Sequence, residues 1–280
     1  MIKRVVVISE PNVGDDGPDR LIITGCQRSG TTLLGMILEA HPRIDLIDEN
    51  NPHYHPVGEI TYELDVEAAA KPHRGNSVLG FKAPRDSHRV AEIVQGIPHL
   101  RVLWIERDIL QVVSSMLSLK VKNGVWAMEF APREIRKHIA ATADEIAQQL
   151  FVSAGELAEE SDREVFLAAL CWLVKRDQRR EAQRAYAPII LHLTYDDLVL
   201  DPESSIRRIL EFLNLDWHDA VLSHHSEIDS SPEFPRPGGA VSARPVDADS
   251  LSKQKSMGDR DRFIVSAVVR AYETGSDPDW

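Results

Sequence analysis

The sequence predicts an α/β fold in which a central parallel sheet is flanked by helices within a single domain. Short apolar segments rich in β-branched residues are typical of strands buried on both faces, and segments with helical periodicity separate them. The size fits as well, because 280 residues with 43% hydrophobic and 27% charged side chains can build one large core without disulfides.

Four segments are predicted as strands of this sheet. They are RLIIT at 20–24, VLGFK at 78–82, LRVLWI at 100–105 and IILHL at 189–193. The first is followed by a glycine-bearing loop and then by a helix whose apolar positions Leu33, Leu34, Ile37 and Leu38 recur at helical spacing. Ligands of parallel sheets bind beyond the carboxyl ends of the strands, so we expect functional residues directly after each segment.

The rest of the chain is predicted to be largely helical. Residues 133–186 are almost free of Gly and Pro, which predicts two or more helices, and another helix is predicted over 203–213. Residues 226–249 are dense in Pro, Gly and Ser, which predicts a long loop or lid. We therefore expect one domain, 1–280, made of a ligand-binding core of about 20–215, a lid or loop region of about 226–254 and a C-terminal helix at 260–272.

Charge and cysteine usage argue against several classes of protein. The net charge of -12 argues against a nucleic-acid partner, because such binding needs clustered Lys and Arg. Cys26 and Cys171 lack metal-ligand spacing, so we expect buried free thiols and no metal. The apolar run near the amino terminus is too short for a signal segment or a membrane span, so we expect a cytoplasmic protein without a membrane partner.

The loop after the first strand, GCQRSGTT at 25–32, is a predicted phosphate-binding loop. A glycine-bearing loop between a strand and a helix presents backbone N–H groups and the positive end of the helix dipole to an anion. The loop departs from the nucleoside-triphosphatase motif, because Thr31 stands at the lysine position and the cation is Arg28. A simple tight turn is the alternative interpretation.

A second predicted anion site follows the strand at 100–105. Arg107 at the strand end and Ser115 in the next helix can converge on one phosphate, the guanidinium as a fork and the hydroxyl as a donor. The alternative for Arg107 is a surface ion pair with Asp108.

At these residues the chain resembles the sulfotransferases that use 3′-phosphoadenosine-5′-phosphosulfate (PAPS), and most closely their protein-tyrosine sulfotransferase branch. The stretches that carry the resemblance, in the family's order, are GCQRSGTTLLGMILEAHP, the Glu49 region, GFKAPR, ERDILQVVSSMLSLKV, LTYDDLVLDPESSIRRILEFLNLDWHDAVLSHH and PVDADSLSK. The resemblance implies a P-loop-like sheet and a donor-binding core at about 20–215.

The resemblance assigns donor-binding roles residue by residue. It places the 5′-phosphosulfate on Arg28, Ser29, Gly30, Thr31 and Thr32. Arg107 and Ser115 fall to the 3′-phosphate, Tyr195 to the adenosine end, and Lys253 closes over the phosphates. The chain departs from the family at Gln254, where the family has Trp, and over 226–243, so acceptor contacts there are open.

Sulfuryl transfer needs a base for the acceptor hydroxyl and cations at the leaving group. The resemblance makes Glu49 the general base, while the rivals His53, His55 and Glu59 stay open because histidine titrates near neutral pH unaided. Lys82 matches the lysine that contacts the transferring group, and Arg28 completes the catalytic set. Pro84 stands where the cytosolic branch has its catalytic histidine.

Two other functions stay open on the sequence alone. One is a P-loop kinase in which Asp108 holds Mg²⁺, which the absent loop lysine disfavours; the other is a catalytically silent nucleotide-binding module. For the sulfotransferase we expect PAPS as donor, adenosine 3′,5′-bisphosphate as product, no metal, and a small-molecule or peptide hydroxyl as acceptor. A homodimer is possible.

Overall fold

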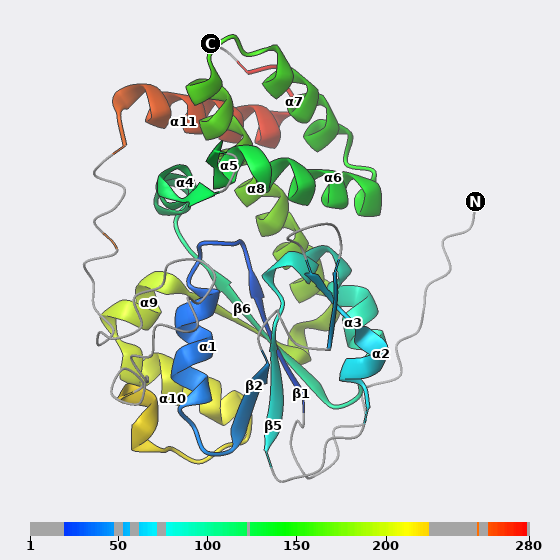
Figure 1. Ribbon diagram of the computed structural model, residues 1–280, viewed down its shortest axis with the longest axis vertical. Coiled ribbons are helices and arrows are strands. Elements are labelled where there is room, and N and C mark those ends of the chain that lie inside the picture. Colours follow the sequence, from blue (N-terminus) through cyan, green and yellow to red (C-terminus); the bar gives the residue numbers. More distant parts are fainter. Residues whose placement is uncertain are drawn as a thin grey trace.

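The computed structural model describes residues 20–47, 53–56, 62–71, 77–121, 124–223, 251 and 257–278 (Figure 1). Its centre is a five-stranded sheet in the order β2–β5–β1–β6–β9, and every neighbouring pair is parallel. The strands are β1 (Arg20–Gly25), β2 (Ile44–Ile47), β5 (Val78–Lys82), β6 (Leu100–Glu106) and β9 (Ile190–Thr194). The predicted fold class, a single α/β domain with a parallel sheet flanked by helices, is confirmed.

The two faces of the sheet are covered by different helices because side chains along a strand alternate between faces. Leu21 and Ile23 of β1 pack in one apolar cluster, and Ile22 between them packs in another. The first face carries α1 (Thr31–Glu39), α9 (Tyr195–Leu200) and α10 (Pro202–Phe212). The second carries α3 (Val90–Gly96) together with the carboxyl-terminal part of α8 (Glu160–Tyr186), and α2 (Val66–Ala69) lies on the same side.

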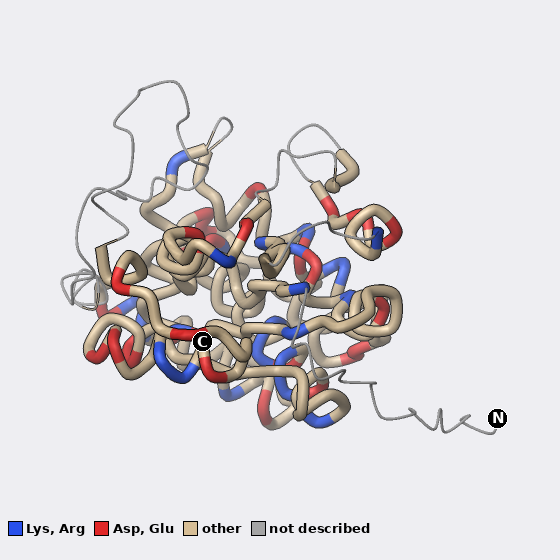
Figure 2. The backbone as a smooth tube through the Cα atoms, turned by 90° about the horizontal axis from the view of Figure 1, so that it is seen from below, with Lys and Arg blue, Asp and Glu red and all other residues tan. Residues whose placement is uncertain are grey.

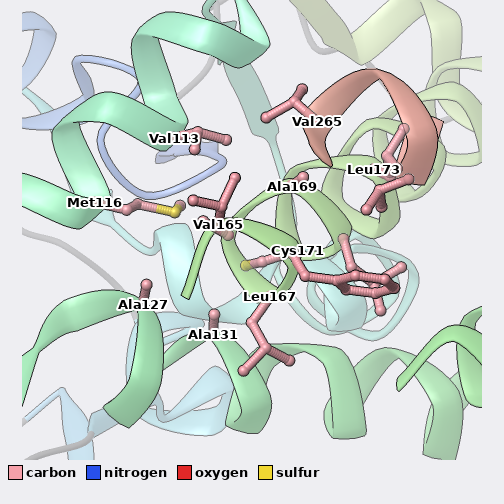
Figure 3. Close-up of a cluster of buried hydrophobic side chains, with 14 of the residues drawn as sticks. Val113, Met116, Ala127, Ala131, Val165, Leu167, Ala169, Cys171, Leu173 and Val265 are labelled. Atoms are coloured by element: carbon pink, nitrogen blue, oxygen red, sulfur yellow. The ribbon is translucent and has the colours of Figure 1, made fainter. Parts of the chain in front are cut away.

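A third apolar cluster forms a helical layer beyond the carboxyl ends of the strands (Figure 1). Besides α8, it contains α4 (Ile109–Ser118), α5 (Trp126–Glu129), α6 (Ala131–Thr142), α7 (Glu145–Glu156) and α11 (Asp259–Thr274). Figure 3 shows Cys171 of α8 among apolar side chains of this layer, and both cysteines are buried free thiols. The layer covers the edge of the sheet at which the sequence predicts the site.

Short elements connect these parts. They are β3 (Tyr54–Pro56) paired with β4 (Tyr62–Leu64), β7 (Lys120–Val121) paired with β8 (Gly124–Val125), and the 3₁₀ turns η1 (Pro84–Arg89), η2 (Ala187–Ile189) and η3 (Asp219–Leu222). The β3–β4 hairpin packs against the second face of the sheet, since Tyr54 and Leu64 belong to its apolar cluster.

The predicted elements lie close to the observed ones. The strand at 78–82 is β5, those at 20–24 and 100–105 end one residue before β1 and β6, that at 189–193 is shifted by one residue from β9, and α11 spans the predicted helix at 260–272. Strand β2 was missed, because IDLI is short and half-exposed. The predicted lid at 226–254 lies outside the described residues except for residue 251.

Charges are interspersed along the described backbone, with Lys and Arg next to Asp and Glu in the view of Figure 2. Of the helices that the structure describes, none combines the length and the apolar character that crossing a bilayer requires.

Candidate active site

The phosphate-binding loop predicted at 25–32 joins β1 to α1 and is held closely by its neighbours. Gly25 has φ +147°, and a Cβ there would lie 2.2 Å from the backbone oxygen of Ile105. Gly30 has φ +99°, and a Cβ there would lie 2.4 Å from Cδ2 of Tyr195. Both positions therefore require glycine, since an L side chain would be strained and would collide with β6 or Tyr195.

The loop leaves polar groups for a ligand. Helix α1 begins after Gly30 without a side-chain cap, so its first backbone N–H groups have no intrahelical partner. Ser29 is 0% exposed, and its Oγ has no hydrogen-bond partner among the described residues. Thr31 is buried and Thr32 half-buried beside it. These donors, together with the helix dipole, fit an anionic oxygen cluster.

Arg107 and Ser115, the second predicted anion site, adjoin this loop. Nε of Arg28 donates to Oγ of Ser115 at 3.1 Å, and Nη1 of Arg107 reaches the backbone oxygen of Arg28 at 3.5 Å. Arg28 thus contacts residues 79 and 87 positions further along the sequence, and the two predicted anion sites adjoin each other.

The guanidinium of Arg107 is fixed from several sides. Its Cζ lies 4.1 Å from the ring centroid of Tyr195, and its Nε donates to Oε1 of Gln111 at 2.8 Å. Nε1 of Trp172 donates to the Arg107 backbone oxygen at 2.8 Å. Tyr195 therefore contacts both Gly30 and Arg107, and it joins the two halves of the site.

The two arginines repel each other inside a poorly solvated site. Burial lowers the pKa of Arg107, and burial followed by the positive charge of Arg107 lowers the pKa of Arg28. Both guanidinium groups remain charged at neutral pH. An anion with several oxygens bound between them relieves this repulsion, so the electrostatics favour a phosphate-bearing ligand.

Asp108 does not form the surface ion pair considered for Arg107. Its Oδ1 accepts from the backbone N–H groups of Leu110 at 2.9 Å and Gln111 at 3.1 Å and so caps α4. The carboxylate that the kinase hypothesis assigns to Mg²⁺ thus serves as a helix cap here.

Lys82 lies at the same edge of the sheet, as the last residue of β5, next to β1. It is 6% exposed, and its backbone oxygen accepts from the Tyr54 hydroxyl at 3.0 Å. The hydroxyl of Thr24 in β1 donates to the backbone oxygen of Ala83 at 3.0 Å. The chain after β5 is therefore tied to the strand that leads into the phosphate-binding loop.

The candidate bases are only partly described. Glu49, its rival Glu59, and Lys253 lie outside the described residues. The ring of His53 lies 5.6 Å from that of Phe81. The side chain of His55 is 66% exposed, and its Nε2 lies 3.0 Å from Oδ2 of Asp65. The choice among these bases stays a prediction.

Two residues that hold Arg107 were not found from the sequence. Gln111 stands one helical turn after Arg107, a spacing that could have indicated the contact. Trp172 comes from α8, 65 residues further along the chain, and no local signal in the sequence links it to Arg107.

Comparison with known proteins places this geometry in context. The family model described as "Sulfotransferase family" matches residues 61–219, which is more than half of the chain. The chain is 23% identical over 292 residues to a protein-tyrosine sulfotransferase of Drosophila melanogaster, covering 92% of this chain and 52% of that protein. It is 25% identical over 272 residues to protein-tyrosine sulfotransferase A of Caenorhabditis elegans, covering 85% and 63%. The chain thus spans less than two thirds of the length of these relatives.

Solved structures share the fold. The sulfotransferase domain of the Synechococcus PCC 7002 olefin synthase aligns with TM-score 0.56 at 16% identity, covering 95% of this chain and 98% of that one. Mouse sulfotransferase SULT7A1, in complex with PAP, aligns with TM-score 0.54 at 13% identity, covering 92% and 85%. At such identities these likenesses bear on the fold alone.

Proposed function

The chain belongs to the sulfotransferase family, and we propose that it moves the sulfuryl group of PAPS to a hydroxyl acceptor. The observation that carries the proposal is the contact between the phosphate-binding loop and the Arg107–Ser115 pair, through Arg28 Nε and Ser115 Oγ at 3.1 Å. A bisphosphorylated adenosine has two separated anionic groups, and two adjoining anion sites suit it better than a single triphosphate cradle.

The donor is held by this chain's own groups. The 5′-phosphosulfate binds to the loop through Arg28, Ser29, Gly30, Thr31 and Thr32. The 3′-phosphate binds to Arg107 and Ser115, the adenosine lies toward Tyr195, and Lys253 closes over the phosphates. Two observations support the first of these assignments: Oγ of Ser29 has no hydrogen-bond partner within the described part of the chain, and α1 starts without a side-chain cap.

The reaction is an in-line displacement at sulfur. The acceptor oxygen forms a bond to the sulfur, the bond from sulfur to the 5′-phosphate oxygen breaks, and the hydroxyl proton passes to Glu49, with His53 and His55 as rival bases. Lys82 and Arg28 stabilise the charge that develops on the leaving phosphate, which becomes adenosine 3′,5′-bisphosphate. No metal ion is needed for this step, because the charges are supplied by side chains.

The acceptor class follows from the relatives. Both named relatives are protein-tyrosine sulfotransferases, which favours a phenolic hydroxyl, of tyrosine in a peptide or of a small molecule. The cytoplasmic location and the homodimer stay predictions.

The first experiment compares ligands by calorimetry and then measures transfer. We expect adenosine 3′,5′-bisphosphate to bind without metal, ATP with Mg²⁺ not to bind, and labelled sulfate to pass from PAPS to tyrosine peptides or phenols. Tight binding of ATP–Mg²⁺ would favour the kinase, and donor binding without transfer to any hydroxyl would favour the silent module.

Variants then test the catalytic set. Arg28→Ala should lower kcat by about 10²–10³-fold, the usual cost of removing one charge-stabilising donor, and Arg28→Lys should recover only part, because it lacks the guanidinium fork. Glu49→Gln should abolish transfer, while His53→Asn and His55→Asn should not, and Glu67→Gln, at the exposed position of α2, is the matched control. Full activity of Glu49→Gln would remove Glu49 as the base.

A further inference from the structure

A buried ion pair lies in the helical layer, where apolar side chains otherwise dominate. Lys175 of α8 is 1% exposed and Glu134 of α6 is 3% exposed, and Nζ of Lys175 lies 2.5 Å from Oε2 of Glu134. Cys171, one turn before Lys175 on α8, and Ala131 of α6 lie in the apolar cluster of Figure 3. Stability alone does not explain two charges in such surroundings, because an apolar pair of similar size would pack there at least as well.

The remaining contacts of Lys175 lead to the active site. Its Nζ also donates to the backbone oxygen of Pro84 at 3.2 Å and to Oγ of Ser87 at 2.7 Å. With Glu134, these acceptors use all three donors of the ammonium group. Pro84 and Ser87 belong to η1, which begins two residues after Lys82. Lys175 therefore holds the segment that directly follows Lys82, the proposed catalytic lysine.

The opposite charges of Glu134 and Lys175 offset the cost of burying each group. Burial alone would raise the pKa of Glu134, but the positive charges of Lys175 and Lys137 and the nearby Gln27 amide hold it below its usual value. Burial alone would lower the pKa of Lys175, but the charge of Glu134 outweighs it and the pKa is raised. Both groups thus stay ionised.

Ser87 is itself anchored by a chain of hydrogen bonds. Its Oγ donates to Oε1 of Gln178 at 2.7 Å, and Nε2 of Gln178 lies 3.1 Å from Nδ1 of His138. Nε2 of His138 lies 3.1 Å from Oδ2 of Asp144, which also accepts from the Tyr272 hydroxyl at 2.9 Å. Both acceptors of Lys175 on η1 are therefore fixed in position. The Pro84 oxygen is fixed because it belongs to the backbone, and the Ser87 hydroxyl is fixed by this series of hydrogen bonds.

We infer that Lys175, with Glu134 as its counter-ion, is a positioning residue that sets Lys82 relative to the phosphate-binding loop. An ammonium group that donates to a carbonyl and a hydroxyl fixes distance and direction, which an apolar contact does not. Thr24 ties Ala83 to β1 on one side, and Lys175 ties Pro84 to the helical layer on the other. The inference rests on the proposed function, since it concerns the geometry of the same transfer.

The test removes both charges together. The double variant Glu134→Met with Lys175→Met replaces the pair by two flexible apolar side chains, a change that is often neutral or stabilising in a buried site. We expect an unfolding midpoint in urea equal to or above that of the wild type. We expect kcat to fall by about 10–100-fold, as misplacing a catalytic group by about 1 Å does, while KM for PAPS and Kd for adenosine 3′,5′-bisphosphate stay unchanged. A merely structural pair would not separate kcat from KM in this way.

The matched control is Arg176→Met with Glu273→Met. Because Arg176 also lies over the ring of Trp172, which holds Arg107, this pair controls for folding, and the control for kcat is Arg260→Met with Asp162→Met, a pair that joins α11 to α8 at 2.6 Å and whose removal should keep the wild-type kcat. A folded Glu134→Met/Lys175→Met protein with the wild-type kcat would overturn the inference.

If the double variant folds poorly, a double-mutant cycle between Ser87 and Lys82 tests the inference instead. Ser87→Ala removes one acceptor of Lys175 and keeps the ion pair, and it should lower kcat several-fold in the wild type but not in a Lys82→Ala background, because the effect acts through Lys82. An equal loss in both backgrounds, or no loss in either, would overturn the inference. A wild-type protein that neither binds adenosine 3′,5′-bisphosphate nor transfers sulfate would overturn the proposed function and this inference with it.

Discussion

The carboxyl edge of the sheet and the helical layer above it differ in how well their buried polar groups are paired. At the edge, polar groups lie in unfavourable surroundings: Ser29 Oγ is buried without a hydrogen-bond partner among the described residues, and the guanidinium groups of Arg28 and Arg107 adjoin despite their repulsion. In the layer, Lys175 and Glu134 satisfy each other and their neighbours on η1.

From this difference we expect the edge of the sheet to govern ligand binding and the helical layer to govern the position of Lys82. Under the proposed function, an anion bound at the edge would offset the repulsion between the two arginines and the burial of the Ser29 hydroxyl. The layer is complete in itself, so its polar groups act by fixing geometry and by their effect on stability. Substitutions at the edge should therefore change binding, and substitutions in the layer should change stability and turnover.

The largest effect that would sharpen this comparison is expected at Glu134. Glu134→Gln leaves the Lys175 ammonium buried and without its counter-ion, which typically costs about 3–5 kcal/mol of stability. The measurement is the free energy of unfolding in urea, by circular dichroism. The control is Glu156→Gln, an exposed glutamate on α7, with an expected change within about 0.5 kcal/mol.

Equal stability of the two variants would break the comparison, because it would mean that the layer tolerates an unpaired charge as the surface does. The Glu134→Met/Lys175→Met protein, by contrast, should be at least as stable as the wild type. Removing one partner of the ion pair should thus lower the free energy of unfolding, whereas removing both partners should leave it equal or raise it.

The edge of the sheet could be predicted from the sequence because its signals are local. The phosphate-binding loop and Arg107 each follow a short apolar strand directly, and Lys82 is the last residue of another; in a parallel sheet the carboxyl ends of strands meet. The register of β1 against β5 and β6 then sets these residues side by side. Even the contact between the loop and Ser115 follows from this topology.

The helical layer could be predicted only as helices. Residues 133–186 form α8 and most of α6, with α7 between them, but the partners Glu134 and Lys175 stand 41 residues apart and no spacing rule pairs them. The same holds for Trp172 and Arg107, 65 residues apart. Such pairs are set by how helices cross, which depends on the whole apolar layer rather than on a local pattern.

A smaller effect is expected from Gly30→Ala, which tests the edge. The added Cβ would lie 2.4 Å from Tyr195 Cδ2 at φ +99°, and the ring cannot move freely because Arg107 lies over it. Backbone strain of this kind costs about 1–3 kcal/mol. We expect Kd for adenosine 3′,5′-bisphosphate to rise by about 10-fold or more, which is about 1.4 kcal/mol.

The control for that substitution is Gly155→Ala in α7. Nothing lies within 4 Å of a Cβ at Gly155, so helix propensity should raise stability by about 0.5–1 kcal/mol and leave Kd unchanged. An unchanged Kd in Gly30→Ala would contradict the tight fit of the loop against Tyr195.

The smallest effect concerns His88 on η1, which lies between the two regions. Burial, followed by the charges of Lys175 and Lys137, lowers the pKa of His88 to about 4 from its usual 6.5, against the opposing charges of Glu134 and Glu63. Between about pH 6.5 and pH 4, His88 is therefore protonated in the unfolded chain but neutral in the folded protein. The free energy of unfolding falls as the pH falls through this window. Between pH 7 and 5.5 the loss from this group is about 1.2 kcal/mol. His88→Gln removes this titrating group. The difference in unfolding free energy between the wild type and His88→Gln should therefore change by about 1.2 kcal/mol between pH 7 and 5.5. A difference that stays constant over this range would show that the His88 side chain on η1 is as open to water as that of a surface turn.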